Sequence, residues 1–164
     1  MSNWTHINCN IVGTFNEQKI EELFGKPVLD WKLPYQYTYG SKKWEKAERL
    51  VEESYNQSKL PCGEVPLNYV LRKPPTYKRE TNVYGVDEDI LTLWGDLRGF
   101  EMSNKEHFKQ IEEIVNKIIN SDSSIRSFIL QAHEEYSGKT YIWSSSFDNK
   151  PILTILDKQY DEQE

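Results

Sequence analysis

Three histidines and two cysteines are the side chains of this 164-residue chain that could serve as bases or nucleophiles near neutral pH. The histidines are His6, His107 and His133. Their spacing matches neither the HExxH pair of a zinc hydrolase nor the HxT repeat of a two-histidine phosphoesterase. His107 is most simply a residue in the first turn of a helix. A small hydrolase that uses His6 or His133 with a nearby carboxylate stays open as an alternative.

Neither the spacing of the cysteines nor the glycine-containing motifs indicate a catalytic site. Cys9 and Cys62 form no CxxC pair, and no base or thiolate-stabilising group lies near Cys62 in the sequence. No GxGxxG, Walker A or EF-hand pattern occurs. The sequence therefore predicts a protein that is not an enzyme, with no catalytic residue, no bound metal and no cofactor.

The stretch ILTLWGDLRGFE, residues 90–101, predicts a strand with two different faces. Side chains alternate along a strand, so Leu91, Leu93 and Leu97 point to one face, and Thr92, Trp94, Asp96 and Arg98 point to the other. The same alternation in residues 4–12 separates Ile7, Cys9 and Ile11 from Trp4, His6, Asn8 and Asn10. If the two strands are neighbours, one open sheet face carries Trp4, His6, Trp94, Asp96 and Arg98.

This face has two interpretations. Indole rings and a guanidinium suit a binding surface on which a flat ligand stacks. Alternatively, Asp96 and Arg98 form an exposed ion pair of little energetic weight, and other parts of the chain cover the aromatic rings.

A second candidate site is the basic segment at residues 72–79, in a chain that is otherwise acidic. Its cations and tyrosine surround two prolines, which stiffen the backbone and lower the cost of ordering it on binding. Arginine and lysine bind phosphates and carboxylates. The candidate contacts are Arg72, Lys73, Tyr77, Lys78 and Arg79. A solvated, charged loop is the alternative.

The elements that position these residues follow from periodicity and capping patterns. Alternation predicts strands at residues 4–12, 67–72 and 90–98, a hairpin of residues 125–136 and 139–144, and an edge segment at 151–156. Helical spacing predicts helices after a Thr14–Glu17 capping box, from about Ser41 to Tyr55, and after a Ser103–Glu106 capping box. Residues 73–89 carry no periodic pattern, as is usual for a functional or mobile connection.

This order of elements predicts an α+β fold. It matches a ferredoxin-like split β-α-β sandwich with an inserted helix and a C-terminal hairpin extension. Residues 1–156 are expected to form a single domain, and residues 157–164 an acidic flexible tail.

Composition limits the possible partners and location. A net charge of −6 and a pI near 5.2 disfavour binding to duplex DNA, where phosphate neutralisation supplies most of the affinity. No long apolar run or secretory signal is present, which predicts a cytoplasmic protein with no membrane partner. A second copy could cover the open sheet face, so a homo-oligomer is a further possibility.

Several short motifs resemble those of small phage and prophage proteins from low-GC Gram-positive bacteria. They are WTHIN (Trp4 to Asn8), Gly25-Lys26-Pro27, LPCGE (Leu60 to Glu64), WGDLR (Trp94 to Arg98) and Ile125-Arg126. In those proteins the turn resembles LPxGSEGxL, and residues 62–67 of this chain lack its serine and its second glycine. The resemblance implies an accessory protein of phage type in the cytoplasm of an infected bacterium, and such proteins often counter antiviral defence.

The resulting hypothesis is a non-catalytic binding protein that blocks a bacterial antiviral pathway. In the first version it sequesters a small anionic, nucleotide-like signal, with a base stacked on an indole and phosphates on the cations. In the second version it binds a host defence protein directly and inhibits it.

Overall fold

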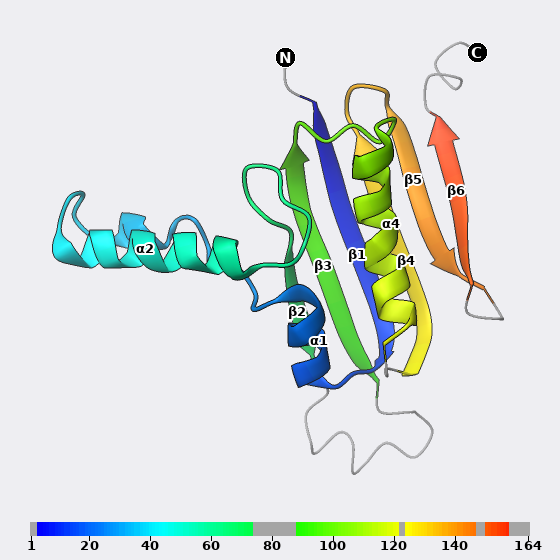
Figure 1. The fold of residues 1–164 in the computed structure, drawn as a ribbon, viewed down its shortest axis with the longest axis horizontal. Coiled ribbons are helices and arrows are strands. Elements are labelled where there is room, and N and C mark those ends of the chain that lie inside the picture. The colour runs from blue at the N-terminus through cyan, green and yellow to red at the C-terminus, as the bar shows by residue number, and fades with distance from the viewer. Residues whose placement is uncertain (1–2, 74–87, 122–123, 147–149, 158–164) are drawn as a thin grey trace.

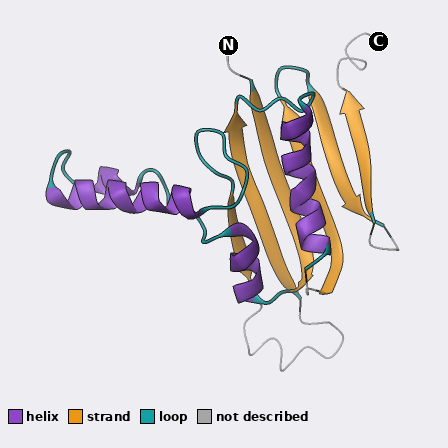
Figure 2. Cartoon of the chain, viewed as in Figure 1, coloured by secondary structure: helices purple, strands orange, loops and turns teal. Residues whose placement is uncertain are grey.

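The computed structural model describes residues 3–73, 88–121, 124–146 and 150–157. Within them the chain is an α+β fold, with helices on an antiparallel six-stranded sheet (Figures 1 and 2). The strands are β1 (Trp4–Thr14), β2 (Asn68–Arg72), β3 (Asp89–Arg98), β4 (Ser124–Glu134), β5 (Lys139–Ser145) and β6 (Pro151–Asp157). The helices are α1 (Glu17–Phe24), the 3₁₀ helix η1 (Leu33–Gln36), α2 (Lys42–Gln57) and α4 (Lys105–Ile119).

The strand order is β2-β3-β1-β4-β5-β6, and every neighbouring pair is antiparallel. The predicted adjacency of the first and third strands is confirmed, because β1 pairs with β3 along its length. This register sets His6 opposite Asp96 and Asn8 opposite Trp94. The predicted C-terminal hairpin and edge segment are confirmed as β4–β5 and β6, although Asp157 belongs to β6 and not to the tail. Residues 158–164 lie outside the described residues.

The core lies between one face of the sheet and helices α1 and α4, which cover that face in Figure 1. Leu91, Leu93 and Leu97 are fully buried there, as the alternation predicts. Helix α4 packs its predicted apolar stripe onto them through Ile111, Ile114, Val115 and Ile118. The opposite face carries the polar and aromatic side chains of β1 and β3, so this much of the sequence prediction holds.

Both predicted capping boxes are displaced from the true helix starts. Asn16, not Thr14, caps α1, and its Oδ1 accepts hydrogen bonds from the N–H groups of Gln18 and Lys19. Asn104, not Ser103, caps α4 in the same way. In each case an asparagine just before the first helical residue accepts hydrogen bonds from two N–H groups of the first turn.

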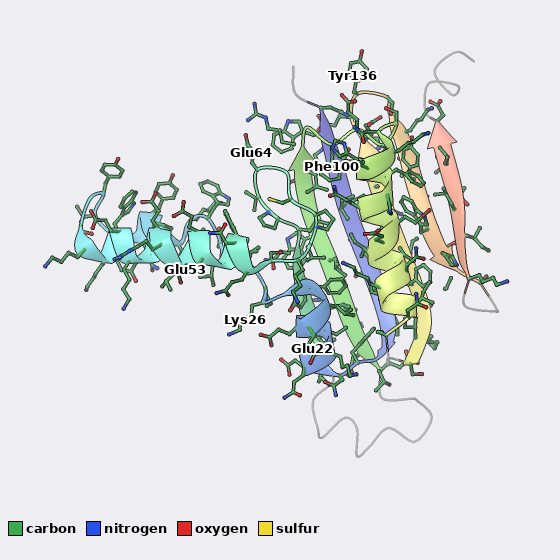
Figure 3. The ribbon with its side chains drawn as sticks, in the orientation of Figure 1. Glu22, Lys26, Glu53, Glu64, Phe100 and Tyr136 are labelled. Carbon is green, nitrogen blue, oxygen red and sulfur yellow. The ribbon has the colours of Figure 1, made fainter. Side chains whose placement is uncertain are left out.

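Helix α2 is present where the sequence predicts it, with Ser41 as its N-cap. It projects away from the sheet at the β2–β3 side, and Glu53 on it points into open space in Figure 3. Ala47 and Val51 of the predicted apolar stripe are buried, but Leu50 is exposed, because the partner of α2 is the small helix η1 and not the core. We call residues 29–57 the helical arm.

Candidate functional site

His6 lies between two carboxylates on the open face of the sheet. Its Nδ1 is 2.5 Å from Oδ1 of Asp96 on β3, and its Nε2 is 2.6 Å from Oε1 of Glu135, in the turn that follows β4. The His6 ring also stacks against His133 of β4, with centroids 6.5 Å apart and planes at 14°. The pairings of β1 with β3 and β4 set these side chains in one row across three strands.

This arrangement stabilises the protonated imidazole. The hydrogen bond to Asp96 raises the pKa of His6 most, and the hydrogen bond to Glu135 raises it further. Partial burial of the imidazole lowers this pKa, but by less. Because both ring nitrogens already bond carboxylates, His6 is poorly placed to take a proton from a substrate. The ring instead fixes the Asp96 carboxylate in one orientation.

A pocket of about 510 Å³ opens beside Asp96, between the open sheet face and the base of the helical arm. Three tryptophans from separate segments line it: Trp4 of β1, Trp94 of β3 and Trp31 of the arm. Trp94 and Trp31 are 41% and 54% exposed, so their rings are accessible to a ligand. We call this cavity the tryptophan pocket.

Asn68 positions the wall of the pocket that the arm supplies. Its side-chain Oδ1 accepts a hydrogen bond from the N–H of Val28, and its Nδ2 donates to the Val28 carbonyl, each at 3.2 Å. The next N–H, that of Leu29, donates to the Ser54 hydroxyl on α2. These bonds join β2, residues 28–29 and α2, and so hold the segment that carries Trp31 at the pocket.

The polar groups of the tryptophan pocket are mixed in charge. Asp30 and Asp96 supply carboxylates, and Lys32 supplies an ammonium whose Nζ lies 5.5 Å from the Trp31 ring centroid. Burial raises the pKa of Tyr55, and the negative charge of Asp30 raises it further. The Tyr55 phenol therefore stays protonated and can donate a hydrogen bond. The pocket can therefore accept hydrogen bonds from amino groups and offer one cation to an anion.

Arg98 lies next to the pocket and not in its lining. Its guanidinium carbon is 6.0 Å from the Trp4 ring centroid, which is a cation–π arrangement. It also forms an ion pair with Glu64, on the loop between α2 and β2 (Figure 3). The alternative pairing of Asp96 with Arg98 is therefore wrong, because Asp96 bonds His6 and Arg98 bonds Glu64.

Two candidate residues of the predicted basic segment, Arg72 and Lys73, lie in the part of the chain that the structure describes. Lys73 Nζ donates to the carbonyl of Phe15 and lies 3.6 Å from the buried carboxylate of Asp89, so it supports the start of β3. Arg72 is exposed at the end of β2, away from the pocket lining. Tyr77, Lys78 and Arg79 lie outside the described residues. The structure thus brings Trp4, His6, Trp94 and Asp96 together, with Arg98 beside them.

The sequence prediction missed Trp31, Asp30, Lys32 and Tyr55. Asp30, Trp31 and Lys32 lie in a segment that is aromatic and contains proline, but no periodicity links it to the sheet, and Tyr55 lies at the end of the predicted second helix. The Asn68–Val28 contact, between residues forty apart, joins the aromatic segment to β2 beside the pocket.

The remaining candidate residues have structural contacts. His107 accepts a hydrogen bond from the N–H of Glu101 and stacks on Phe100. The Cys62 residue is exposed, but partial burial of its thiol raises the pKa of that thiol, which disfavours the reactive thiolate. His133 Nδ1 lies 2.9 Å from the Thr140 hydroxyl.

In the part of the chain that the structure describes, no group of three or more His, Cys, Asp or Glu side chains is arranged to hold a metal ion. No helix there is long and apolar enough to cross a membrane. Comparisons with known protein families, with curated proteins and with solved structures gave no significant match.

Proposed function

We propose that the protein acts by non-catalytic binding and that the tryptophan pocket takes a small nucleotide-like ligand. The observation that carries this proposal is the convergence of Trp4, Trp31 and Trp94 on one pocket of about 510 Å³. Small-molecule sites have volumes of roughly 300–1,000 Å³ and aromatic linings with a few fixed polar groups. Indole rings stack on any nucleobase, since every base has a π face.

The charges around the pocket favour one orientation of such a ligand. The carboxylates of Asp96 and Asp30 can accept hydrogen bonds from the amino and ring N–H groups of a base. Lys32 lines the pocket, and Arg98 lies against Trp4, so phosphates directed toward them would meet positive charge. In this orientation the base occupies the aromatic part and the phosphates lie near Lys32 and Arg98.

The biological role that we propose is to counter a bacterial antiviral pathway by sequestering its small nucleotide signal. It is supported by the resemblance of the WTHIN and WGDLR motifs to phage and prophage proteins, and those two motifs supply Trp4, His6, Trp94 and Asp96. The site of action would be the cytoplasm of an infected bacterium.

We also propose that β1 to β4 form a ferredoxin-like unit. The order β2-β3-β1-β4, with α1 between β1 and β2 and α4 between β3 and β4, supports this assignment. The helical arm would then be an insertion after α1, and β5 and β6 a C-terminal extension.

Calorimetric titration of the Trp94→Ala variant tests the proposed site, with nucleoside monophosphates and cyclic dinucleotides as probes. Loss of one stacking ring is expected to weaken binding by about 1–3 kcal/mol, or roughly 5- to 150-fold. Tyr39→Ala is the matched control, because Tyr39 is 82% exposed and lies outside the pocket lining. Binding that is equally tight in the wild type and in Trp94→Ala would contradict the site.

Direct inhibition of a host defence protein is a second candidate, favoured by the helical arm. The arm exposes Tyr35 at 68% and Tyr39 at 82%, and aromatic side chains are typical anchors of protein interfaces. Under this candidate, Tyr39→Ala would break a complex with the purified defence protein, whereas Trp94→Ala would leave it intact. The same pair of variants therefore separates the two candidates.

A further inference from the structure

Strand β6 is an apolar edge with no strand on its outer side in the described part of the sheet. Ile152, Ile155 and Leu156 are each 51% exposed, and Leu153 is 38% exposed. Edge strands of soluble monomers are usually protected by charges, prolines or bulges, because a bare edge pairs with other chains. From Ile152 to Leu156 the strand ILTIL carries no charged residue.

Both faces of β6 are apolar. The register with β5 places Leu156 beside Thr140 on the open face of the sheet, and Ile155 and Leu153 beside Tyr141 and Trp143 on the helix face. The rings of Tyr141 and Trp143 are buried and contact Phe108 of α4, whereas their β6 neighbours remain exposed. In Figure 1, α4 crosses the sheet over strands other than β6. The apolar surface of β6 therefore continues the core of the protein beyond the reach of α4.

The sequence of β6 is complementary to itself in the antiparallel direction. Rotation by 180° about Thr154 sets Leu153 opposite Ile155 and Ile152 opposite Leu156, so the pairs on either side of the central Thr154 pair are aliphatic. A two-fold symmetric interface needs this property, since residue i of one copy meets residue j of the other and the reverse. Aliphatic cross-strand pairs of this kind stabilise sheets.

The last residue of the strand favours the same arrangement. Antiparallel pairing about Thr154 sets Asp157 of each copy opposite Pro151 of the other, whereas in-register parallel pairing would set the two Asp157 carboxylates side by side. Like charges directly opposite one another destabilise a sheet, so the antiparallel arrangement is favoured.

We propose that β6 pairs antiparallel with β6 of a second copy about Thr154, which joins the two six-stranded sheets into one. The tryptophan pocket lies at the opposite, β2–β3 side of each sheet, so the dimer has two separate pockets. This inference does not depend on what the pocket binds.

Sedimentation velocity over a range of micromolar concentrations tests the proposal. The wild type is expected to sediment as a dimer, whereas Ile155→Lys and Leu153→Glu are each expected to sediment as monomers. Because position 155 of one copy faces position 153 of the other, a mixture of the two variants is expected to recover the dimer through one Lys–Glu pair and one Leu–Ile pair. The matched control is Ile90→Lys, which puts the same charge on a 40% exposed isoleucine of β3; it is expected to stay dimeric.

Circular dichroism of each variant checks that the fold is intact. The sedimenting mass of the wild type tests the dimer by itself, because that measurement involves no substitution. A monomeric wild type, or a dimer that persists in Ile155→Lys, would overturn the pairing of β6. Failure of the mixture to restore the dimer would overturn the register about Thr154.

Discussion

His6 connects the two sides of the open sheet face by a pair of charge-assisted hydrogen bonds. Asp96 on one side and Glu135 on the other stabilise its protonated form, so the folded protein binds this proton more tightly than the unfolded chain. The stabilising contribution is therefore full below the ordinary His pKa of 6.5 and is lost as the pH rises through the raised pKa of the folded state. Solvent limits its size, since the side chain is 39% exposed.

We predict that His6→Gln lowers the free energy of unfolding more at about pH 6 than at about pH 9. Urea denaturation of both proteins at the two values measures the difference. NMR titration of the imidazole provides the direct check, with a His6 midpoint above the ordinary value as the expected result. If His6→Gln lowers the free energy of unfolding equally at both pH values, or more at the higher one, the assignment of the proton to His6 is refuted.

At the residue scale, alternation along the strands was enough to predict which side chains share the open face. Trp4, His6, Trp94 and Asp96 lie there as predicted, and the three leucines of β3 lie on the other face. The partners were not predictable, because alternation along one strand does not identify which side chain of another segment meets it. The same holds for Glu64, which takes Arg98 away from Asp96.

At the scale of the elements, the start of α4 shows that two adjacent residues can both suit the N-cap position, and the structure uses the second of them. Ser103 and Glu106 form a capping-box pattern, yet Asn104 caps α4 by accepting from the N–H groups of Glu106 and His107 at 2.9 and 3.3 Å. Serine and asparagine are both good N-caps, so the sequence leaves the choice between adjacent positions to tertiary packing.

Asn104→Ala is expected to destabilise the protein by about 1 kcal/mol, because two N–H groups of α4 lose their acceptor. Ser103→Ala is the adjacent control and is expected to change stability by less than half as much. Thermal and urea unfolding of the two variants measure this. Equal losses, or a larger loss for Ser103→Ala, would restore the capping box that the sequence pattern suggests.

Helix α2 illustrates a different limit of sequence patterns. Its apolar stripe predicts a helix correctly, but periodicity does not identify what the stripe packs against. In the structure the partner is η1, and the arm that they form leaves Trp31, Tyr35 and Tyr39 exposed. This is also why the arm's contribution to the tryptophan pocket could not be predicted.

At the scale of the whole molecule, the order of strands and helices was enough to predict an α+β fold with neighbouring first and third strands. The pocket required one further fact, the position of residues 28–32 beside β2. The proposed ligand pocket at the β2–β3 side and the proposed self-association at β6 lie at opposite edges of one sheet, so each can be tested without disturbing the other.

Native mass spectrometry tests the central claim most directly, on wild type and Trp94→Ala purified in parallel from bacteria with an active nucleotide-signalling defence. Spectra before and after denaturation identify any molecule that the folded protein carries. We expect a small nucleotide that is released from the wild type and is missing from Trp94→Ala. The same molecule in equal amount on both proteins, or a bound host protein and no small molecule on the wild type, would contradict the claim.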